Sequence, residues 1–198
     1  MRRALGGVLA LSGAVLLLVV GVAYARGALA RDRARAEWSA SDARDAVLAI
    51  DRHVGASAVR EPLAAGAPMA RLIIPVIHLD EVVVEGVEDA QLAAGPGHLP
   101  ASAFPGDSGN AVISAHRDRH FHGLDELSLG DTVITETVAG RTTWVVVGRR
   151  VVERGKPALF PTETPTLTLT TCWPVRYIGP APDRLLITAR PVPSARRI

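Results

Sequence analysis

The sequence predicts an all-β domain, a closed barrel or a sandwich, behind an N-terminal transmembrane helix and a helical stalk. Three observations support this prediction. An uncharged apolar run opens the chain, the segments after residue 66 are short and rich in β-branched residues, and Gly, Pro and Asp separate them. The 198-residue chain leaves about 130 residues for this domain, which is enough for a self-sufficient core.

The N-terminal run, residues 4–25, contains no charge and follows two arginines. At a rise of about 1.5 Å per residue, a helix of this length crosses a hydrocarbon core of about 30 Å. Residues 23–25, Ala-Tyr-Ala, resemble a signal-peptidase site, so a cleaved signal peptide is the alternative. We favour the anchor because the run exceeds the ~7 to 15 residues of a signal h-region.

Residues 1–3 are then expected to be a cytoplasmic tail, residues 4–25 the transmembrane anchor, and the rest of the chain extracytoplasmic. Four arginines between residues 26 and 35 weaken the charge asymmetry that supports this orientation.

Residues 26–66 are predicted to be a juxtamembrane stalk and linker. A helical pattern covers residues 33–52 and ends before Gly55 and Pro62, so we expect it to be a spacer. The domain proper is predicted over residues 67–198. It contains 13 Lys and Arg against 14 Asp and Glu, a formal charge of −1, and this balance argues against nucleic-acid binding.

Seven segments of the domain have the composition of strands, and turn residues lie between them. Short helices are expected only near residues 88–93 and 124–127. The predicted strands are residues 70–74, 82–85, 110–114, 132–135, 142–147, 166–170 and 185–188.

Cys172 is the only cysteine of the chain. Cysteines of exported proteins are usually paired, so a single one is a buried packing residue, an intermolecular crosslink or a nucleophile. Cys172 ends a predicted strand, and His116 follows another. Arg184 begins a third, and Arg176 and Arg190 compete with it for the same role. A thiol attacks, an imidazole transfers protons and a guanidinium binds developing negative charge, so we favour the nucleophile.

Metal binding is not expected, although two acidic or imidazole-rich segments invite it. Arg117 and Arg119 interrupt the first segment and would repel a cation, so it is a weak zinc site. Its candidate ligands are His116, Asp118, His120 and His122. The acidic residues of the second segment are spread over a strand and a turn, unlike a calcium loop, so we expect solvated charges. They are Asp80, Glu81, Glu85, Glu88 and Asp89.

The histidine and cysteine segments belong to a set of motifs that resembles the sortases, the cell-surface cysteine transpeptidases, and most closely their class D group. Six segments match in the family's order and cover most of residues 70–190. They are residues 95–98, 105–110, 114–118, 129–131, 168–172 and 177–184. The resemblance implies an eight-stranded sortase barrel, a single N-terminal anchor, no cofactor, and a catalytic triad of Cys172, His116 and Arg184.

The resemblance also implies a reaction and its partners. Cys172 would cleave an L-P-x-T-G-like or L-P-x-T-A-like sorting signal of an exported protein through a thioester. An amine of a peptidoglycan precursor or of another surface protein would accept the chain, at the outer face of the cytoplasmic membrane. A catalytically silent envelope barrel that binds or scaffolds is the alternative. An L,D-transpeptidase does not fit, because its Ser-x-Gly-Cys pattern is missing.

The chain departs from the family beside the triad. Ser114 and Ala115 precede the histidine where the family commonly has a glycine before the Ala-His or Gly-His pair, and Trp173-Pro174-Val175 replaces a Tyr-Pro-Phe sequence. Trp173 either forms a wall of the groove or packs as an ordinary indole. The residues expected to contact substrate are Ser114, Ala115, Thr171, Trp173 and His122.

Overall fold

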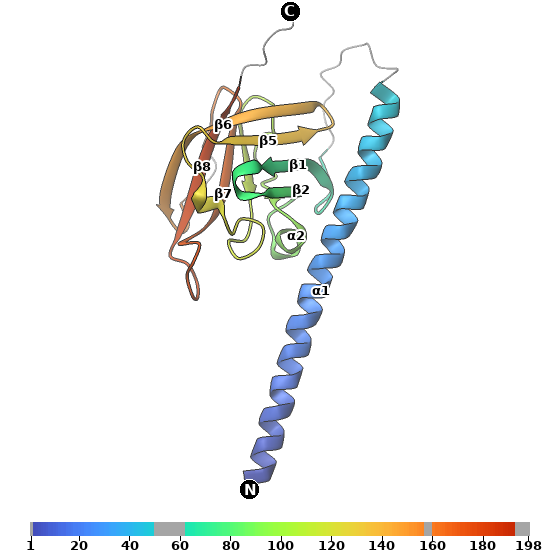
Figure 1. Cartoon of the computed structure of the whole chain (residues 1–198), viewed down its shortest axis with the longest axis vertical. Coiled ribbons are helices and arrows are strands. Elements are labelled where there is room, and N and C mark those ends of the chain that lie inside the picture. The colour runs from blue at the N-terminus through green and yellow to red at the C-terminus, as the bar shows by residue number, and fades with distance from the viewer. Residues whose placement is uncertain (1, 50–61, 157–159, 193–198) are drawn as a thin grey trace, which may run out of the picture.

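The computed structural model describes residues 2–49, 62–156 and 160–192, with side chains of the first helix described from residue 6 to residue 41. A long helix, α1 (Arg2–Ala49), runs beside a closed barrel whose strands follow the order β1-β2-β3-β4-β7-β8-β6-β5 (Figure 1). The predicted all-β barrel is therefore confirmed. The strands are β1 Pro68–Ile74, β2 Leu79–Glu85, β3 Gly97–His98, β4 Asn110–Ser114, β5 Thr132–Thr137, β6 Gly140–Glu153, β7 Thr166–Trp173 and β8 Asp183–Pro191.

All seven predicted strands are present, and the eighth is β3, which has two residues. This strand pairs in parallel with β2 and antiparallel with β4, so it joins two parts of the barrel. Only a glycine fits at position 97, because a Cβ there would overlap the carbonyl oxygen of Gly86. The two expected short helices are α2 (Asp89–Ala94) and the 3-10 turn η2 (Leu124–Glu126), and a further 3-10 turn, η1 (Pro75–Ile77), joins β1 to β2.

The strands alternate between an apolar inner face and an outer face. On β4, β7 and β8 the inner side chains belong to one buried core cluster. These are Ala111, Ile113, Ala115, Leu167, Leu169, Leu185, Ile187 and Ala189. The residues between them therefore face outward, and this alternation decides where functional side chains of these strands lie.

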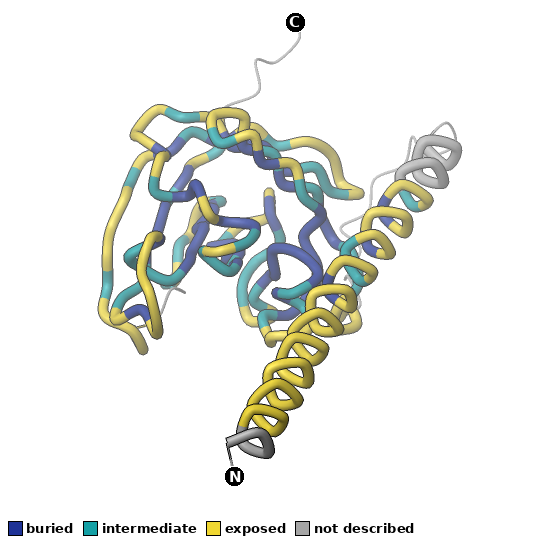
Figure 2. The backbone as a smooth tube through the Cα atoms, turned by 60° about the horizontal axis from the view of Figure 1, so that its bottom comes forward, coloured by how far each residue is buried: buried dark blue, intermediate teal, exposed yellow. Residues whose placement is uncertain are grey.

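The helix α1 is continuous from the apolar run to Ala49 within the predicted stalk, whose residues 50–61 lie outside the described part of the chain. The structure differs here from the expected spacer, because residues 27–38 pack on the barrel. Gly27, Ala34 and Trp38 are buried, and their spacing places them on one side of the helix. Figure 2 shows these contacts along the upper half of α1, whereas the lower half is exposed on all sides. Residues 6–41 include an apolar stretch long enough to cross a membrane, and none of that stretch is buried.

Close approach and hydrophobic contact hold α1 on the barrel. A Cβ at Gly27 would lie only 3.0 Å from the carbonyl oxygen of Ala93 in α2, so a larger residue would push the helices apart. Further along α1, Ala34 and Trp38 form a buried cluster with Val82 and Val84 of β2.

Charged groups surround this apolar contact. Glu81 of β2 lies 3.0 Å from the Arg35 guanidinium, 3.7 Å from Arg31 and 3.4 Å from the imidazole of His120. Burial alone would raise the pKa of Glu81, but the hydrogen bond with His120 and the positive charges around it hold that pKa below its usual range. Glu81 is thus not the solvated charge that the sequence suggested, since it links α1 to the barrel.

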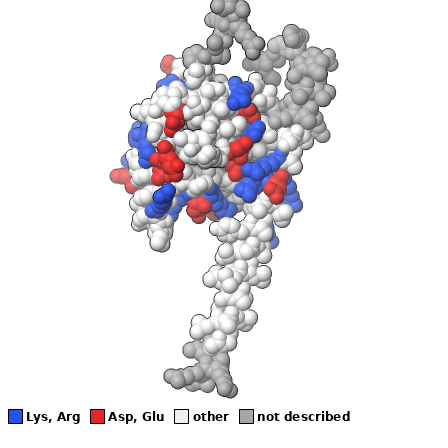
Figure 3. All heavy atoms as spheres, viewed as in Figure 1, with Lys and Arg blue, Asp and Glu red and all other residues white. Residues whose placement is uncertain are grey.

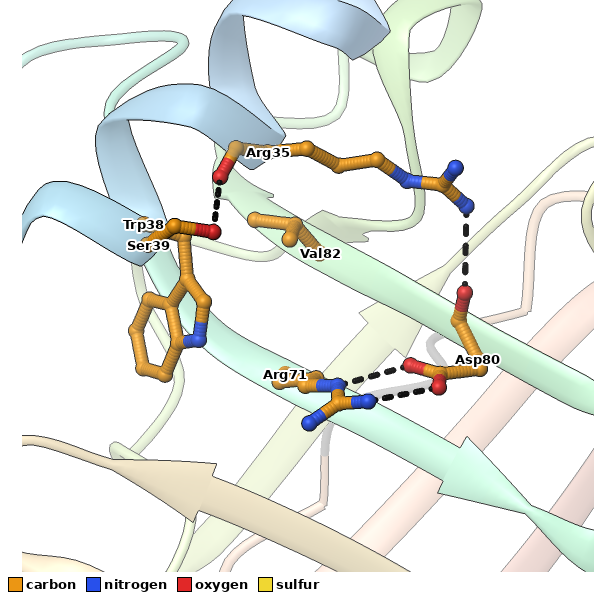
Figure 4. A pocket seen from close by; sticks show the side chains of 6 residues that line it. All are labelled: Arg35, Trp38, Ser39, Arg71, Asp80 and Val82. Atoms are coloured by element: carbon orange, nitrogen blue, oxygen red, sulfur yellow. Dashed lines mark hydrogen bonds and ion pairs between the residues drawn. The ribbon is translucent and has the colours of Figure 1, made fainter. Parts of the chain in front are cut away.

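A second ion pair lies beside the first, around a pocket between α1 and the barrel. Arg71 donates two hydrogen bonds to the carboxylate of Asp80, at 2.7 and 2.6 Å, and Arg35 donates one to the Asp80 carbonyl oxygen at 3.2 Å (Figure 4). The hydrogen bonds from Arg71 lower the pKa of Asp80. Trp38 lies across the same pocket from this pair (Figure 4).

We predict that Glu81→Gln weakens this contact in a pH-dependent way. Because the folded pKa of Glu81 is lowered, its contribution is present above the pKa of the unfolded chain, roughly 4.5, and is lost as the pH falls from there through the lower folded pKa. Thermal unfolding of the full chain in detergent should show a loss of about 1 kcal/mol for Glu81→Gln at neutral pH, and a smaller loss on acidification than in the wild type. Glu126→Gln is the control, since Glu126 is more than half exposed. Equal acid sensitivity in wild type and Glu81→Gln would contradict the prediction.

Candidate active site

Three neighbouring strands of the barrel carry the predicted triad. β4 pairs in parallel with β7, from Asn110 opposite Thr166 to Ser114 opposite Thr170, and β7 pairs antiparallel with β8. Because β4 and β7 run in the same direction, the residues that follow them leave the barrel at the same edge.

The register brings the three side chains to one place. Cys172 is directly opposite Arg184 in the β7–β8 ladder. His116 and Cys172 each lie two positions beyond the Ser114–Thr170 pair, and the Ala115 N–H continues the ladder by donating to the Thr170 carbonyl at 3.2 Å. By the alternation of the strands, Cys172 and Arg184 lie on the outer face of the barrel, and His116 follows the end of β4 at the same edge.

Each of the three side chains is partly exposed, which a reacting group requires. Cys172 is a free thiol at a strand end on the outer face, outside the core cluster. Of the two competing arginines, Arg176 lies in the β7–β8 loop with 86% of its side chain exposed, and Arg190 contacts Thr164 at the other end of β8. The geometry therefore selects Arg184 as the cation nearest in register to the thiol.

The backbone around His116 is held by hydrogen bonds. Thr171 donates from its hydroxyl to the Ala115 carbonyl at 2.7 Å, and both residues are buried. The His116 carbonyl accepts from the N–H groups of Arg119 at 3.3 Å and Phe121 at 3.1 Å. Ala115 and Thr171 therefore support the histidine from inside the barrel, while Ser114 is half-buried on the outer face.

Trp173 and His122, the remaining two residues predicted to contact substrate, do not lie on the outer face of the barrel that carries the Cys172 thiol. Trp173 packs against the core cluster, with the Arg149 guanidinium 5.5 Å from its ring centre. His122 is exposed, donates to the Arg119 carbonyl at 2.8 Å, and lines a cavity of about 350 Å³ that Tyr24 of α1 also lines. These contacts favour the packing interpretation of Trp173 and place His122 on the side of α1.

The other groups considered as metal ligands are also dispersed. His120 is buried against Glu81, and Asp118 is exposed. Glu85 is buried and pairs with Nδ1 of His98 at 2.7 Å, while Nε2 of His98 contacts the Ala103 carbonyl and the Ser102 hydroxyl, both at 2.9 Å. Within the described part of the chain, no three His, Cys, Asp or Glu side chains are grouped so that they could hold a metal ion.

Arg117 was not predicted to belong to the site and was considered only as a charge that would repel a metal ion. Its guanidinium donates to the carbonyl of Pro174 at 2.8 Å and to that of Gly179 at 2.6 Å, and lies 5.7 Å from the ring centre of Tyr177. Arg117 thus joins the segment that begins at His116 to the loop between β7 and β8. The one feature of the sequence that pointed to a role for Arg117 is its position next to His116 in a motif shared with the family.

Thr170 precedes Cys172 by two residues and shares its outward face, but it is buried. Its hydroxyl is closed to solvent and has no hydrogen-bond partner among the residues that the structure describes. Thr166 and Thr168 are buried as well, so the outward face of β7 becomes accessible only at Cys172.

Comparisons with known proteins agree with this architecture. Residues 72–192 match the Sortase domain family. Sortase D of Bacillus subtilis (strain 168) is 34% identical over 123 residues, which are 61% of this chain and 62% of that protein, so the match spans less than two thirds of the relative.

Two solved structures share the fold. A sortase D5 transpeptidase of Clostridium perfringens superimposes with a TM-score of 0.65 at 20% identity, over 85% of this chain and 99% of that one. Sortase C1 of Streptococcus agalactiae gives 0.60 at 26% identity, over 84% and 90%. The resemblance to class D sortases that the motifs predicted is confirmed, and the chain belongs to the sortase family.

Proposed function

We propose that this chain is a membrane-anchored cysteine transpeptidase that cleaves an L-P-x-T-G-like or L-P-x-T-A-like sorting signal and transfers the cleaved protein to an amine. The observation that supports the proposal is the register of β4, β7 and β8, which pairs Cys172 with Arg184 and ends β4 beside β7 two residues before His116. A thiol, an imidazole and a guanidinium together supply what acyl transfer from a peptide bond needs.

In the first half of the reaction, the Cys172 thiolate attacks the carbonyl carbon of the scissile bond, and Arg184 stabilises the oxyanion that forms. The C–N bond breaks, His116 gives its proton to the departing amine, and a thioester remains on Cys172. In the second half, the acceptor amine attacks the thioester and loses a proton to His116. The new amide leaves, and the thiolate is restored.

The substrate is proposed to reach Cys172 at the edge of the barrel where β4 and β7 end. The outward residues of the two strands before this edge are buried; they are Asn110, Val112, Thr166, Thr168 and Thr170. The sorting signal therefore approaches from the side on which His116, Cys172 and Arg184 are partly exposed.

The anchor assignment completes the proposal. Residues 4–25 of α1 span the cytoplasmic membrane, with residues 1–3 inside, and the catalytic domain of residues 67–198 lies outside. The exported client proteins and the amine, from a peptidoglycan precursor or another surface protein, meet the enzyme there. Support comes from the apolar part of α1, which makes no buried contact with the barrel.

We predict that Cys172→Ala abolishes cleavage and that Arg184→Lys lowers kcat by about 10²-fold or more, because an ammonium cannot replace the forked donors of the guanidinium. The full chain in detergent is mixed with a panel of fluorogenic L-P-x-T-G and L-P-x-T-A peptides and an amine, and the thioester on the intact protein is sought by mass spectrometry. Arg190→Lys is the matched control and should retain activity. If the wild type forms no thioester with any peptide, a silent binding barrel becomes the better interpretation.

Arg117 is proposed as a positioning residue. Arg117→Lys should lower kcat about tenfold with little change in KM, since a lysine cannot bond the Pro174 and Gly179 carbonyls together and the β7–β8 loop beside the thiol would shift. Peptide cleavage and thermal unfolding are measured in parallel, with the exposed Arg141→Lys as control. A wild-type kcat in Arg117→Lys would show that the loop does not depend on this guanidinium.

A further inference from the structure

The loop between β7 and β8 exposes an isoleucine to an unusual degree. Ile178 is 100% exposed, whereas Leu17 in the apolar run of α1 is 75% exposed. Its neighbour Tyr177 is 48% exposed, and the side chain of Arg176 is 86% exposed. We call Arg176, Tyr177 and Ile178 the loop tip. A single exposed apolar residue needs no explanation, so the position of the tip has to carry the argument.

The loop tip is held in its projecting position. Arg117 donates to the carbonyls of Pro174 and Gly179, which lie on either side of the tip, and so closes the neck of the loop. Val175 is buried at the same neck. Gly179 adopts a φ of 95°, which turns the chain back toward β8. Ile178 therefore projects from the barrel because the neck is fixed, and it lies outside the core cluster.

The barrel has a fixed orientation relative to the apolar run. Gly27, Ala34 and Trp38 are buried in its contact with α1, and Glu81 adds ion pairs to it. Tyr24 stacks with Arg119, whose guanidinium lies 4.7 Å from the ring centre, so the barrel touches α1 where the apolar run ends. Because α1 is one continuous helix, a bilayer around residues 4–25 must lie directly below the barrel.

The loop tip lies on the side of the barrel that faces this bilayer. Figure 1 shows the β7–β8 loop extending below the barrel toward the level at which α1 continues alone to its N-terminus. Figure 3 shows Lys, Arg, Asp and Glu scattered over the visible face of the barrel and the upper part of α1, while the described atoms of the lower part of α1 show none on this face. The loop and the anchor thus point the same way from a common rigid unit.

We propose that the loop tip inserts into the outer surface of the membrane that α1 spans. This inference rests on the anchor assignment of the proposed function. The three side chains suit the gradient of a bilayer surface: isoleucine enters the acyl boundary, tyrosine lies among the head groups, and arginine reaches the lipid phosphates. Arg176 lies 3.9 Å from the Glu126 carboxylate, and this exposed pair is weak enough to be exchanged for a phosphate. The barrel then has two attachments to the lipid, and Cys172 and Arg184, at the base of the same loop, open close to the bilayer surface.

Quenching by lipid tests the contact without any need for activity. Ile178→Cys, Leu17→Cys and Val138→Cys are each made in the full chain with Cys172→Ala, labelled with an environment-sensitive fluorophore, and reconstituted into nanodiscs of phosphatidylcholine and phosphatidylglycerol. Val138 is the matched control, because it is 64% exposed in the turn between β5 and β6, away from the β7–β8 loop (Figure 1). Nitroxide-bearing lipids are then added to the bilayer composition, and the loss of fluorescence is measured.

Quenching at positions 17 and 178 with little at position 138 is the expected result. If position 17 is quenched and position 178 matches position 138, the anchor stands and the loop contact is overturned. If position 17 is not quenched, the anchor assignment fails and the inference fails with it. A label at position 178 that is shielded from aqueous iodide but not quenched by lipid would show that protein covers the tip, and this also overturns the proposal.

Discussion

The parallel pairing of β4 with β7 is the constraint on which the rest of the site depends. Fifty-six positions separate His116 from Cys172 in the sequence, and only a parallel ladder brings the residues after both strands to one edge. The antiparallel pairing of β7 with β8 then sets Arg184 opposite Cys172. A shift of one residue in either register would turn a member of the proposed triad toward the core. Burial of the inner face therefore also determines which side chains face outward.

Composition and alternation made most of the barrel predictable. β-branched runs such as Val82–Val84 and Thr142–Val147 can bury one face only in a sheet, and each became part of a strand. Strand β3 was not predicted, because a strand of two residues is too short to show an alternating pattern. Its formation also depends on the close approach of Gly97 to Gly86. The proposed triad, Cys172, His116 and Arg184, was suggested by residue types at predicted strand ends and by the motifs shared with the family. Their order in space, however, comes from pairings that no local pattern encodes.

The roles of the other residues around the site could not be predicted from the sequence, because they depend on contacts with residues far away in the chain. Arg117 bonds two carbonyls about sixty positions away, and Glu81 meets arginines of α1 about fifty positions away. The sequence shows no partner for Glu81, so its charge was predicted to be solvated. His122 lies in the segment that begins at His116 and was therefore expected near the thiol. The turn after His116 instead places it at a cavity that Tyr24 also lines.

The segment that begins at His116 joins the three parts of the molecule. Arg117 holds the β7–β8 loop, Arg119 stacks on Tyr24 of α1, and His120 pairs with Glu81 beside the α1 arginines. Buried Phe121 ties the segment to the core. A displacement of α1 against the barrel would therefore act on the backbone next to His116, the proposed general acid and base. The contact between α1 and the barrel is thus also a support of the segment that carries this histidine.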